Sequence, residues 1–238
     1  MPAPLIVIPA RMASSRLPGK PLADIAGRPM IAHMVRIARA AALGEVVVAA
    51  AEPEIAAVAE AAGARAVLTD PDLPSGTDRV QAAVAAIGAG GADVIVNLQG
   101  DMPTMDPGDV VRAVAALENA DIATLVAPSD DPDDRANPNL VKAIVAADGR
   151  CLYFTRAPAP WGEGPIQRHV GIYVYRREAL ARFVAAPPSP LETREKLEQL
   201  RALELGMTIR AGVTSDFPKG VDSPADLELA RRLLGGRG

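Results

Sequence analysis

The chain has 238 residues, enough for one large or two small α/β domains with a sizeable core. Hydrophobic residues make up 49% and charged residues 23%, which excludes an intrinsically disordered chain. The net charge of −4 argues against a general nucleic-acid binder, because such proteins carry a basic face. The single cysteine, Cys151, excludes an internal disulfide and a cysteine-based zinc site. The sequence shows neither a signal peptide nor an apolar run of about 18 residues, so we expect a cytoplasmic protein.

Apolar runs of strand length alternate with helical segments over the first half of the chain. Continuous apolar runs predict strands, and apolar residues at helical spacing predict helices. The predicted strands are 5–10, 45–50, 65–69, 93–101 and 122–128. The predicted helices are 29–41, 52–63, 77–89 and 107–119, the first with Pro29 in its first turn. This order predicts an α/β fold with a mainly parallel, doubly wound sheet.

The alternation weakens after residue 128. The elements predicted there are a polar loop at 129–139, a hairpin at 140–157 that turns at Asp148–Gly149, an irregular connection at 157–165, a strand at 169–177, helices at 177–186 and 191–206, a strand at 208–214 and a helix at 223–234. Ser223 is the expected N-cap of the last helix, with Pro224 at its first position. The sequence therefore predicts one domain over 1–238, with an antiparallel excursion in its C-terminal half.

The loop after the first strand is cationic. Within IPARMASSRLPGKPL, at 8–22, the cations are Arg11, Arg16 and Lys20. The Gly-Lys pair suggests a Walker A loop, but Ser14 stands where that motif needs glycine and Pro21 where it needs serine or threonine. A Gly-x-Gly-x-x-Gly motif is also missing, which argues against a dinucleotide-binding Rossmann site. Side-chain charges would therefore hold an anion in this loop.

Two further polar loops follow predicted strands at the same edge of the sheet. LQGDMP, at 98–103, carries Asp101, and LPSGTDR, at 73–79, opens a helix whose N-terminal amides can receive an anion. Ligands of open α/β sheets bind beyond the C-terminal ends of the strands. Cations in one loop and a carboxylate in another suit a nucleoside triphosphate with Mg²⁺. The residues alone indicate a magnesium–nucleotide enzyme.

A family resemblance extends this reading over nearly the whole chain. It rests on the ordered segments IPARMASSRLPGKPLADIAGRPMI, SGTDR, NLQGD, NPNLVKAI, LYFTRAPAPW, RHVGIY, PSPLETREKLEQLRALELG and GVDSPADLELAR. Together they resemble the 3-deoxy-manno-octulosonate cytidylyltransferases. The resemblance implies a nucleotide-diphospho-sugar-transferase fold, a homodimer, and Mg²⁺-dependent transfer of CMP from CTP to the sugar's anomeric hydroxyl, with release of pyrophosphate, for lipopolysaccharide assembly. It assigns nucleotide binding to 1–128 and sugar binding and dimerisation to 129–238.

The resemblance also implies roles for residues of the nucleotide half. Arg11 and Lys20 would face the triphosphate, and with Asp101 they form the expected catalytic set. The expected CTP contacts are Ala10, Arg11, Lys20, Ser75, Thr77, Arg79 and Gln99. Asp101 and Asp222 would bind Mg²⁺. From the residues alone, Asp101 could also be a turn residue and Asp222 a helix-entry residue favoured by the helix dipole.

For the sugar, the resemblance implies contacts from the second half of the chain. Arg156 is the candidate for the sugar carboxylate, because a guanidinium suits bidentate recognition. The other expected contacts are His169, Tyr173, Glu198 and Gln199. From the residues alone, His169 could be a satisfied buried polar residue, and the pair at 198–199 a solvated helix face. We assign no catalytic role to His33, Cys151 or Trp161.

Three departures from the family pattern bear on substrate detail and metal affinity. Met102 replaces the glutamate of many relatives, AAAEPEI lacks an expected aspartate after the second strand, and the stretch between Trp161 and Arg168 is short. Two alternatives stay open. One is the same reaction on an 8-amino or sialic-acid-like sugar, although the RGGSKR pattern expected for the sialic-acid enzymes is absent. The other is a catalytically silent nucleotide-binding regulator.

Overall fold

The computed structural model describes residues 3–14 and 16–236, without the side chains of residues 89 and 90. Backbone contacts divide them into two compact units. The first unit contains the residues up to Val110 and those from Pro218 onward, and the second contains Val111–Phe217. The predicted single domain with a functional division at residue 128 stays a prediction, because backbone contacts do not say which half binds which substrate.

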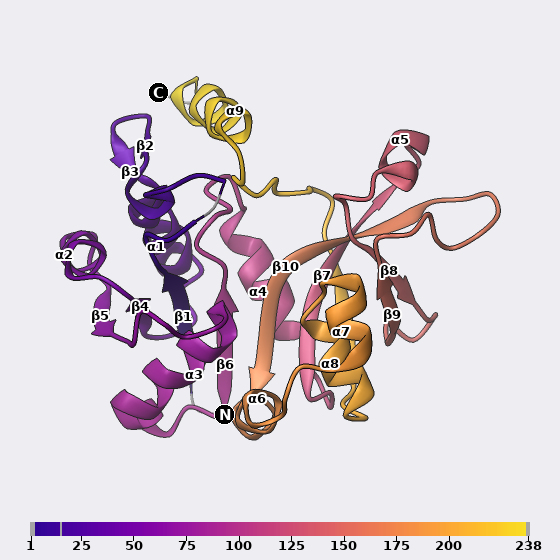
Figure 1. Cartoon of the computed structure of the whole chain (residues 1–238), viewed down its shortest axis with the longest axis horizontal. Helices are drawn as coiled ribbons and strands as arrows, with labels where there is room; N and C mark the ends of the chain where they lie inside the picture. The colour runs from indigo at the N-terminus through magenta and orange to yellow at the C-terminus, as the bar shows by residue number, and fades with distance from the viewer. Residues whose placement is uncertain (1–2, 15, 237–238) are drawn as a thin grey trace. The chain divides into compact units, whose positions relative to one another are not determined.

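Four parallel strands form the sheet of the first unit (Figure 1). In spatial order they are β6 (Val94–Leu98), β1 (Leu5–Ala10), β4 (Val46–Ala50) and β5 (Arg65–Leu68). Every residue of β1, β4 and β6 is buried, whereas β5 at the edge is partly exposed. Burial on both faces explains why these sequences are nearly continuously apolar and do not alternate.

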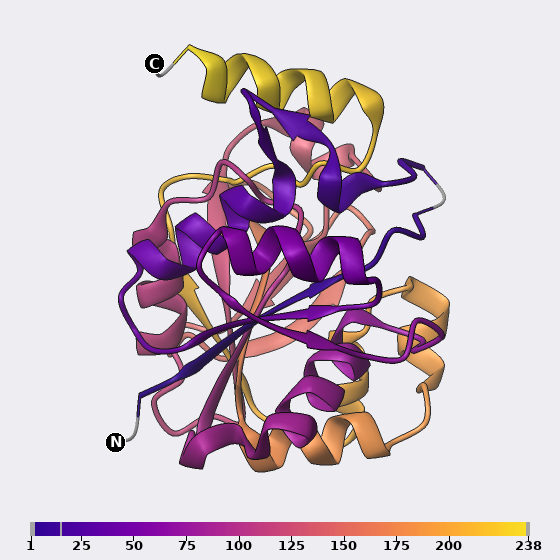
Figure 2. The same ribbon diagram turned by 90° about the vertical axis from the view of Figure 1, so that its left-hand side faces the viewer.

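Helices cover both faces of this sheet (Figure 2). In that view α1 (Met30–Ala40) and α2 (Pro53–Ala61) lie above the strands, and α3 (Gly76–Ile87) lies below them. The remaining elements are η1 (Lys20–Leu22), the hairpin β2 (Asp24–Ile25) and β3 (Arg28–Pro29), η2 (Gly88–Gly91), α4 (Pro107–Ala115) after β6, and the last helix, α9 (Pro224–Gly235). The predicted doubly wound arrangement is confirmed.

The second unit is largely antiparallel. Its central strand β7 (Ile122–Ser129) pairs in parallel with β11 (Ile209–Val213) and antiparallel with β10 (Ile166–Arg176). A hairpin of β8 (Lys142–Val145) and β9 (Cys151–Thr155) continues from β10. The helices are α5 (Pro132–Ala136), α6 (Arg177–Ala185), α7 (Pro190–Glu195) and α8 (Gln199–Glu204). The predicted antiparallel excursion is therefore confirmed, and its hairpin turns at Gly149, whose φ of 85° favours glycine.

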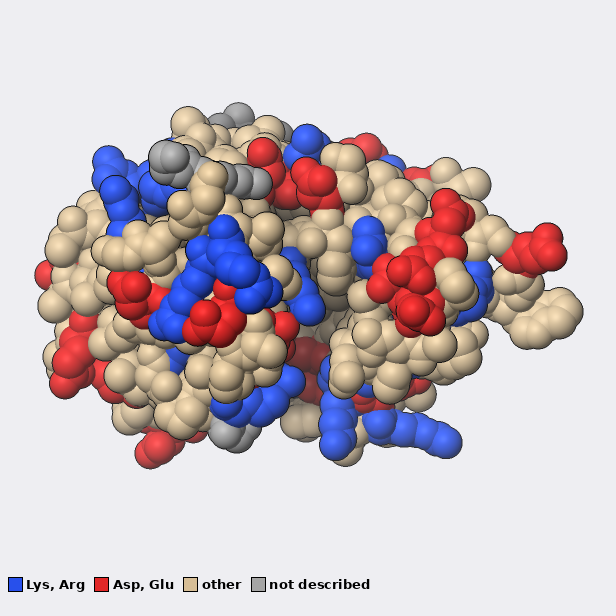
Figure 3. Space-filling view, turned by 90° about the horizontal axis from the view of Figure 1, so that it is seen from above, with Lys and Arg blue, Asp and Glu red and all other residues tan. Residues whose placement is uncertain are grey.

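On the face drawn in Figure 3, basic and acidic side chains are interspersed over the surface and do not gather into one basic stripe. An extended nucleic-acid backbone would require such a stripe. No helix in the described ranges has both the length and the apolarity needed to span a membrane.

Most predicted elements appear within a few residues of their expected ends, with three informative differences. Pro29 is the N-cap of α1 and not a first-turn residue. The loop at 129–139 contains α5, a short helix capped by Asp131 with Pro132 at its first position. The predicted helix 223–234 begins as expected, because Ser223 and Asp226 form a capping box.

The third difference is that the predicted helix 191–206 is two helices. α7 ends at Glu195, and Lys196 takes the left-handed conformation, with φ 57° and ψ 47°. In a continuous helix, the Glu195 carbonyl would accept a hydrogen bond from residue 199. Here that carbonyl accepts a bond from Arg156 Nε at 3.1 Å, while the Glu195 carboxylate accepts from Thr155 Oγ1 at 2.9 Å. Bonds to the end of β9 therefore interrupt the helix.

The left-handed residue makes a stability prediction. Lys196 is exposed and is not glycine, so its backbone conformation costs free energy that glycine avoids. We expect Lys196→Gly to raise the free energy of unfolding by about 0.5–1 kcal/mol in chemical denaturation. Lys196→Ala is the matched control and should leave it nearly unchanged. Equal effects of the two substitutions would contradict this explanation.

Candidate functional site

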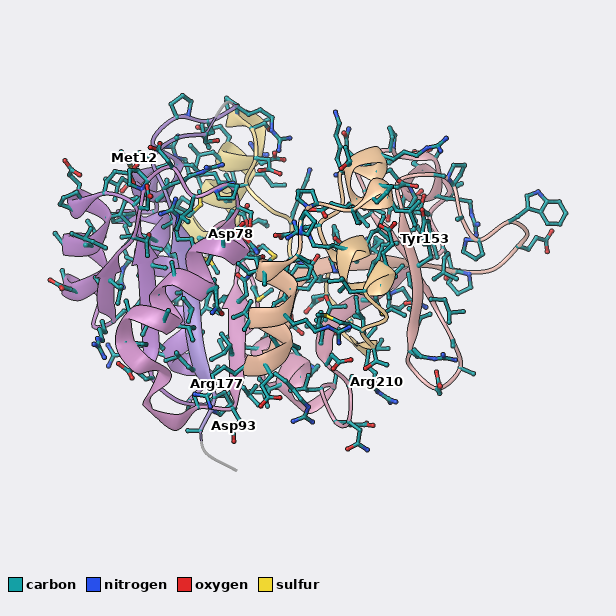
Figure 4. The ribbon with its side chains drawn as sticks, turned by 60° about the horizontal axis from the view of Figure 1, so that its bottom comes forward. Met12, Asp78, Asp93, Tyr153, Arg177 and Arg210 are labelled. Carbon is teal, nitrogen blue, oxygen red and sulfur yellow. The ribbon has the colours of Figure 1, made fainter. Side chains whose placement is uncertain are left out.

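A cleft of about 720 Å³ lies in the first unit, at the C-terminal ends of β1 and β6. Its lining residues are Pro9, Ala10, Arg11, Ala13, Ser14, Arg16, Lys20, Pro21, Ser75, Gly76, Arg79, Gln99, Gly100 and Asp101. Met12 and Asp78 belong to two of the loops that line the cleft, those at 8–22 and 73–79. In Figure 4 they lie apart from Asp93, which marks the opposite, N-terminal end of β6. The structure thus brings together the three polar loops that the sequence places at one sheet edge.

The Lys20 ammonium group connects the two aspartates predicted to bind metal. Its Nζ lies 2.8 Å from Asp101 Oδ2 and 3.2 Å from Asp222 Oδ1. Arg16 Nη2 contacts the other oxygen of Asp222 at 3.2 Å. Burial alone would lower the pKa of Lys20, but the charges of Asp101 and Asp222 and their hydrogen bonds raise it. Residues 101 and 222 therefore meet at one cation.

The turn before α9 carries Asp222 to this position. The backbone N–H of Val221 donates to the Asp101 carbonyl at 2.9 Å, which ties the turn to the loop after β6. The Asp226 carboxylate accepts bonds from the N–H groups of Asp222 and Ser223, at 3.3 and 3.0 Å. Val221 of this turn also belongs to a buried apolar cluster, whose members are Ile25, Met30, Val221, Leu227 and Ala230. This packing anchors the turn from both sides.

Two features shape the loop after β1. Both carboxylate oxygens of Glu52 accept from the Met12 N–H, at 3.1 and 3.0 Å. Gly100 lets the end of β6 pass close to β1, since a Cβ there would lie 3.0 Å from the Pro9 carbonyl oxygen. Glu52 was missed from the sequence, although AAAEPEI was noted for lacking an aspartate. Its carboxylate fixes the residue that follows Arg11.

A chain of buried amides orients Gln99. Its Nε2 donates to Asn97 Oδ1 at 3.2 Å, and Asn97 Nδ2 donates to Thr77 Oγ1 at 3.2 Å. Asn97 and Thr77 are buried, and neither lines the cleft. Thr77 therefore acts on the cleft through its neighbours. Asn97 was missed, although one polar residue within the apolar run of β6 is a usable signal.

Arg79 and Ser75 support the wall formed by α3. The buried guanidinium of Arg79 donates to Thr69 Oγ1 at 2.6 Å and to the carbonyls of Asp70 and Pro71 at 2.9 and 3.2 Å. Burial, followed by the charge of Arg11, lowers the pKa of Arg79. Ser75 caps α3 and accepts from the Asp78 N–H at 3.1 Å. Both residues line the cleft and also hold its backbone in place.

The carboxylates of Asp101 and Asp222 bind Lys20 and Arg16 in this structure, and they are oxygen donors of the kind that a hard divalent cation takes. Within the described ranges, no three His, Cys, Asp or Glu side chains are grouped as metal ligands. Asp101 and Asp222 are a two-carboxylate set, and Mg²⁺ takes one or two protein carboxylates and completes its shell with water and phosphate oxygens. Met102, which follows Asp101 and replaces the glutamate of many relatives, is buried.

In the second unit, His169 and Tyr173 lie on β10 with their ring centroids 5.4 Å apart. Thr124 Oγ1 donates to the carbonyls of Val170 and Ile172, so the bond of 2.9 Å between Thr124 and His169 is donated by His169 Nε2. Burial lowers the pKa of His169 to about 4, so its ring is neutral at pH 7. Burial and the neighbouring charges of Tyr175 and Glu198 raise the pKa of Tyr173.

The other predicted sugar residues gather at the junction of α7 and α8. Arg156, which follows β9, donates from its backbone N–H to Glu195 Oε2 at 3.1 Å. Tyr153 belongs to β9, which contacts α8, and it is labelled in Figure 4. Gln199 is 5% exposed, and its buried Nε2 has no hydrogen-bond partner among the described residues. A buried amide donor of this kind can bind a water molecule or a ligand oxygen.

Cys151 is buried, and burial raises its pKa to about 12. A thiol with such a pKa is not a nucleophile at neutral pH. Trp161 is 99% exposed and His33 is buried, with Nε2 2.8 Å from the Ile25 carbonyl oxygen. These positions are compatible with the absence of a catalytic role for all three.

Comparison with known proteins identifies the family. The family model of the cytidylyltransferases matches residues 5–209. A 3-deoxy-manno-octulosonate cytidylyltransferase of Parvibaculum lavamentivorans is 60% identical over 98% of this chain and 93% of the relative. One of Rhodospirillum centenum is 60% identical over 97% and 93%. The chain belongs to the 3-deoxy-manno-octulosonate cytidylyltransferase family.

A solved structure supports the same conclusion for this cytidylyltransferase. A CMP:2-keto-3-deoxy-manno-octonic acid synthetase complexed with CTP superposes with a TM-score of 0.92 at 39% identity. The match covers 99% of this chain and all of that one. The family resemblance and the fold class predicted from the sequence are both confirmed.

The buried His169 predicts a pH-dependent stability. Because its pKa in the folded protein is about 4 and its ordinary value is 6.5, protonation favours the unfolded chain. The neutral His169 ring makes its full contribution to the free energy of unfolding above pH 6.5. That contribution is lost as the pH falls from 6.5 toward 4, by about 3 kcal/mol in all. Chemical denaturation at pH 7 and at pH 5 should show about 2 kcal/mol of this loss.

His33→Gln is the matched control, because His33 is the chain's other histidine. We expect it to retain the pH dependence contributed by His169, whereas His169→Gln should flatten it. If the His169→Gln variant kept the full slope, the buried neutral imidazole would not be its source.

Proposed function

We propose that this chain transfers CMP from CTP to the anomeric hydroxyl of 3-deoxy-manno-octulosonate and releases pyrophosphate, as a step of lipopolysaccharide biosynthesis. The observation that carries the proposal is the meeting of Lys20, Asp101 and Asp222 at a cleft lined by Arg11 and Arg16. Cations there suit a triphosphate, and the paired carboxylates suit its metal ion. The family membership names the reaction that such a cleft performs.

The chemistry follows from charge. The sugar hydroxyl oxygen forms a bond to the α-phosphorus of CTP, and the bond to the bridging oxygen of pyrophosphate breaks. Negative charge grows on the phosphate oxygens and on the departing pyrophosphate, where Arg11 and Lys20 stabilise it. Mg²⁺ held by Asp101 and Asp222 would supply Lewis-acid stabilisation of the same charge. The cytidine contacts are Ala10, Ser75 and Gln99, with Thr77 and Arg79 supporting the wall.

The second unit supplies the proposed sugar contacts. Arg156 receives the carboxylate, and His169, Tyr173, Glu198 and Gln199 bind hydroxyls. The unpartnered Nε2 of Gln199 supports this assignment, because a sugar oxygen would satisfy it. We also propose Mg²⁺ as the physiological metal, a homodimer as the assembly and the cytoplasm as the location, as the family resemblance implies.

Pyrophosphate release with CTP, Mg²⁺ and the octulosonate tests the function. We expect turnover with CTP in strong preference to ATP, because base contacts come from three separate loops. The same assay is run with an 8-amino octulosonate and with a sialic acid. Higher kcat/KM for either sugar would transfer the proposal to that substrate. CTP binding without turnover of any sugar would favour the regulator and overturn the proposed enzyme.

The paired aspartates make a sharper prediction. Asp101→Asn and Asp222→Asn keep the side-chain shape and remove charge, so each should lower kcat/KM at least about 10²-fold, or roughly 2.7 kcal/mol. The double variant should be little worse than either single variant, because both serve one metal site. Calorimetric titration of Mg²⁺ into the CTP complex should show weaker binding in each.

Asp93→Asn is the matched control, since Asp93 precedes β6 whereas Asp101 follows it. Its activity and Mg²⁺ affinity should stay close to those of the parent protein. If the two single losses multiplied in the double variant, Asp101 and Asp222 would be serving separate functions.

A further inference from the structure

The NPNLVKAI segment contains a buried cation that the proposed reaction does not use. Lys142, on β8, is 0% exposed. Its Nζ donates to the carbonyls of Asn137, Leu140 and Arg156, at 2.6, 3.0 and 3.0 Å. The three N–H donors of the ammonium group therefore have three carbonyl acceptors.

Arg156 binds the two carbonyls of the 137–140 loop that Lys142 does not bind. Its Nη1 lies 3.1 Å from the Pro138 oxygen and 3.5 Å from the Asn139 oxygen. The four consecutive carbonyls of 137–140 thus face two cations. Those of Asn137 and Leu140 bind Lys142, and those of Pro138 and Asn139 face Arg156. Because Lys142 also binds the Arg156 carbonyl, one ammonium group fixes both the loop and the backbone of the arginine.

Burying the Lys142 ammonium group costs free energy that simple packing of the interior does not require. Removing an ammonium group from water costs several kcal/mol, and an apolar side chain of similar size avoids that cost. Burial, and then the charge of Arg156, lowers the pKa of Lys142, while Asp134 and Glu195 oppose the shift. What the lysine supplies is three N–H donors for three backbone carbonyls, which an apolar side chain lacks.

We propose that Lys142 is a positioning residue for carboxylate recognition: it holds the 137–140 loop so that the Arg156 guanidinium is oriented toward the carboxylate of the sugar. Lys142 itself does not touch substrate. The inference rests on the proposed function, since it assigns Arg156 the carboxylate of a 2-keto-3-deoxy sugar acid.

Steady-state kinetics of Lys142→Met, Arg156→Ala and the double variant test the inference. Lys142→Met should raise KM for the octulosonate at least 10-fold and change KM for CTP less than twofold. In the Arg156→Ala background the same substitution should change KM for the sugar less than twofold, because its effect passes through Arg156. Arg65→Met, at an exposed cation on β5, is the control and should match the parent protein.

Equal rises of both KM values, or effects that multiply in the double variant, would overturn the inference. If Lys142→Met does not fold, Lys142→Gln, which keeps two N–H donors, is subjected to the same comparison with Arg156→Ala.

A measurement without substrate separates this inference from the proposed function. Arg156 Nε donates to the Glu195 carbonyl at 3.1 Å, so its proton should exchange slowly with water in nitrogen-15 NMR. The exchange should become at least 10-fold faster in Lys142→Gln and stay unchanged in Arg65→Met. Unchanged exchange in Lys142→Gln would overturn the coupling of the two cations, whatever reaction the enzyme catalyses. Absence of turnover in the parent protein would instead overturn the proposed function.

Discussion

The first unit depends on the Lys20 ammonium group, which binds Asp101 and Asp222 together. Two carboxylates that both contact one ammonium group lie close enough to repel each other, and the cation between them offsets that repulsion. The contact joins the loop after β1, the loop after β6 and the turn before α9. The backbone bond from Val221 to Asp101 and the apolar cluster under α9 hold the same three segments. Chain segments from both ends of the sequence therefore share one charge centre beside the cleft.

Buried cations also organise irregular backbone elsewhere in the molecule. Arg79 binds a side-chain oxygen and two carbonyls of the 69–71 loop, and Lys142 binds carbonyls of 137–140. In these loops the Asn137 carbonyl also accepts from the Leu140 N–H and the Asp70 carbonyl from the Leu73 N–H. The carbonyls of Pro71, Pro138 and Leu140, by contrast, take their donors from cationic side chains. A cation supplies several donors from one side chain. This explains why basic residues occur in the interior of a chain whose net charge is negative.

The sequence predicted the elements well where one local rule governs them. Continuous apolar runs predicted β1, β4 and β6 because both faces of a parallel sheet are buried. Ser223 was predicted as an N-cap because its bonds reach only three residues along the chain. The break at Lys196 was not predicted, because the apolar spacing continues through it and bonds from Thr155 and Arg156 cause it. Asn97 was missed because its partner Thr77, which lies on α3, becomes its neighbour only in the folded structure.

By itself, the sequence determined the family, the α/β class and the cationic loop at the end of the first strand. These depend on residue type and spacing within short segments, or on ordered motifs. Only the tertiary structure decided that Lys20 lies between two aspartates 121 positions apart in sequence, that Asn97 is held by Thr77 of α3, and that Lys142 and Arg156 share one loop. Such contacts join segments that are distant along the chain, and their geometry follows from packing and burial, which no local pattern encodes.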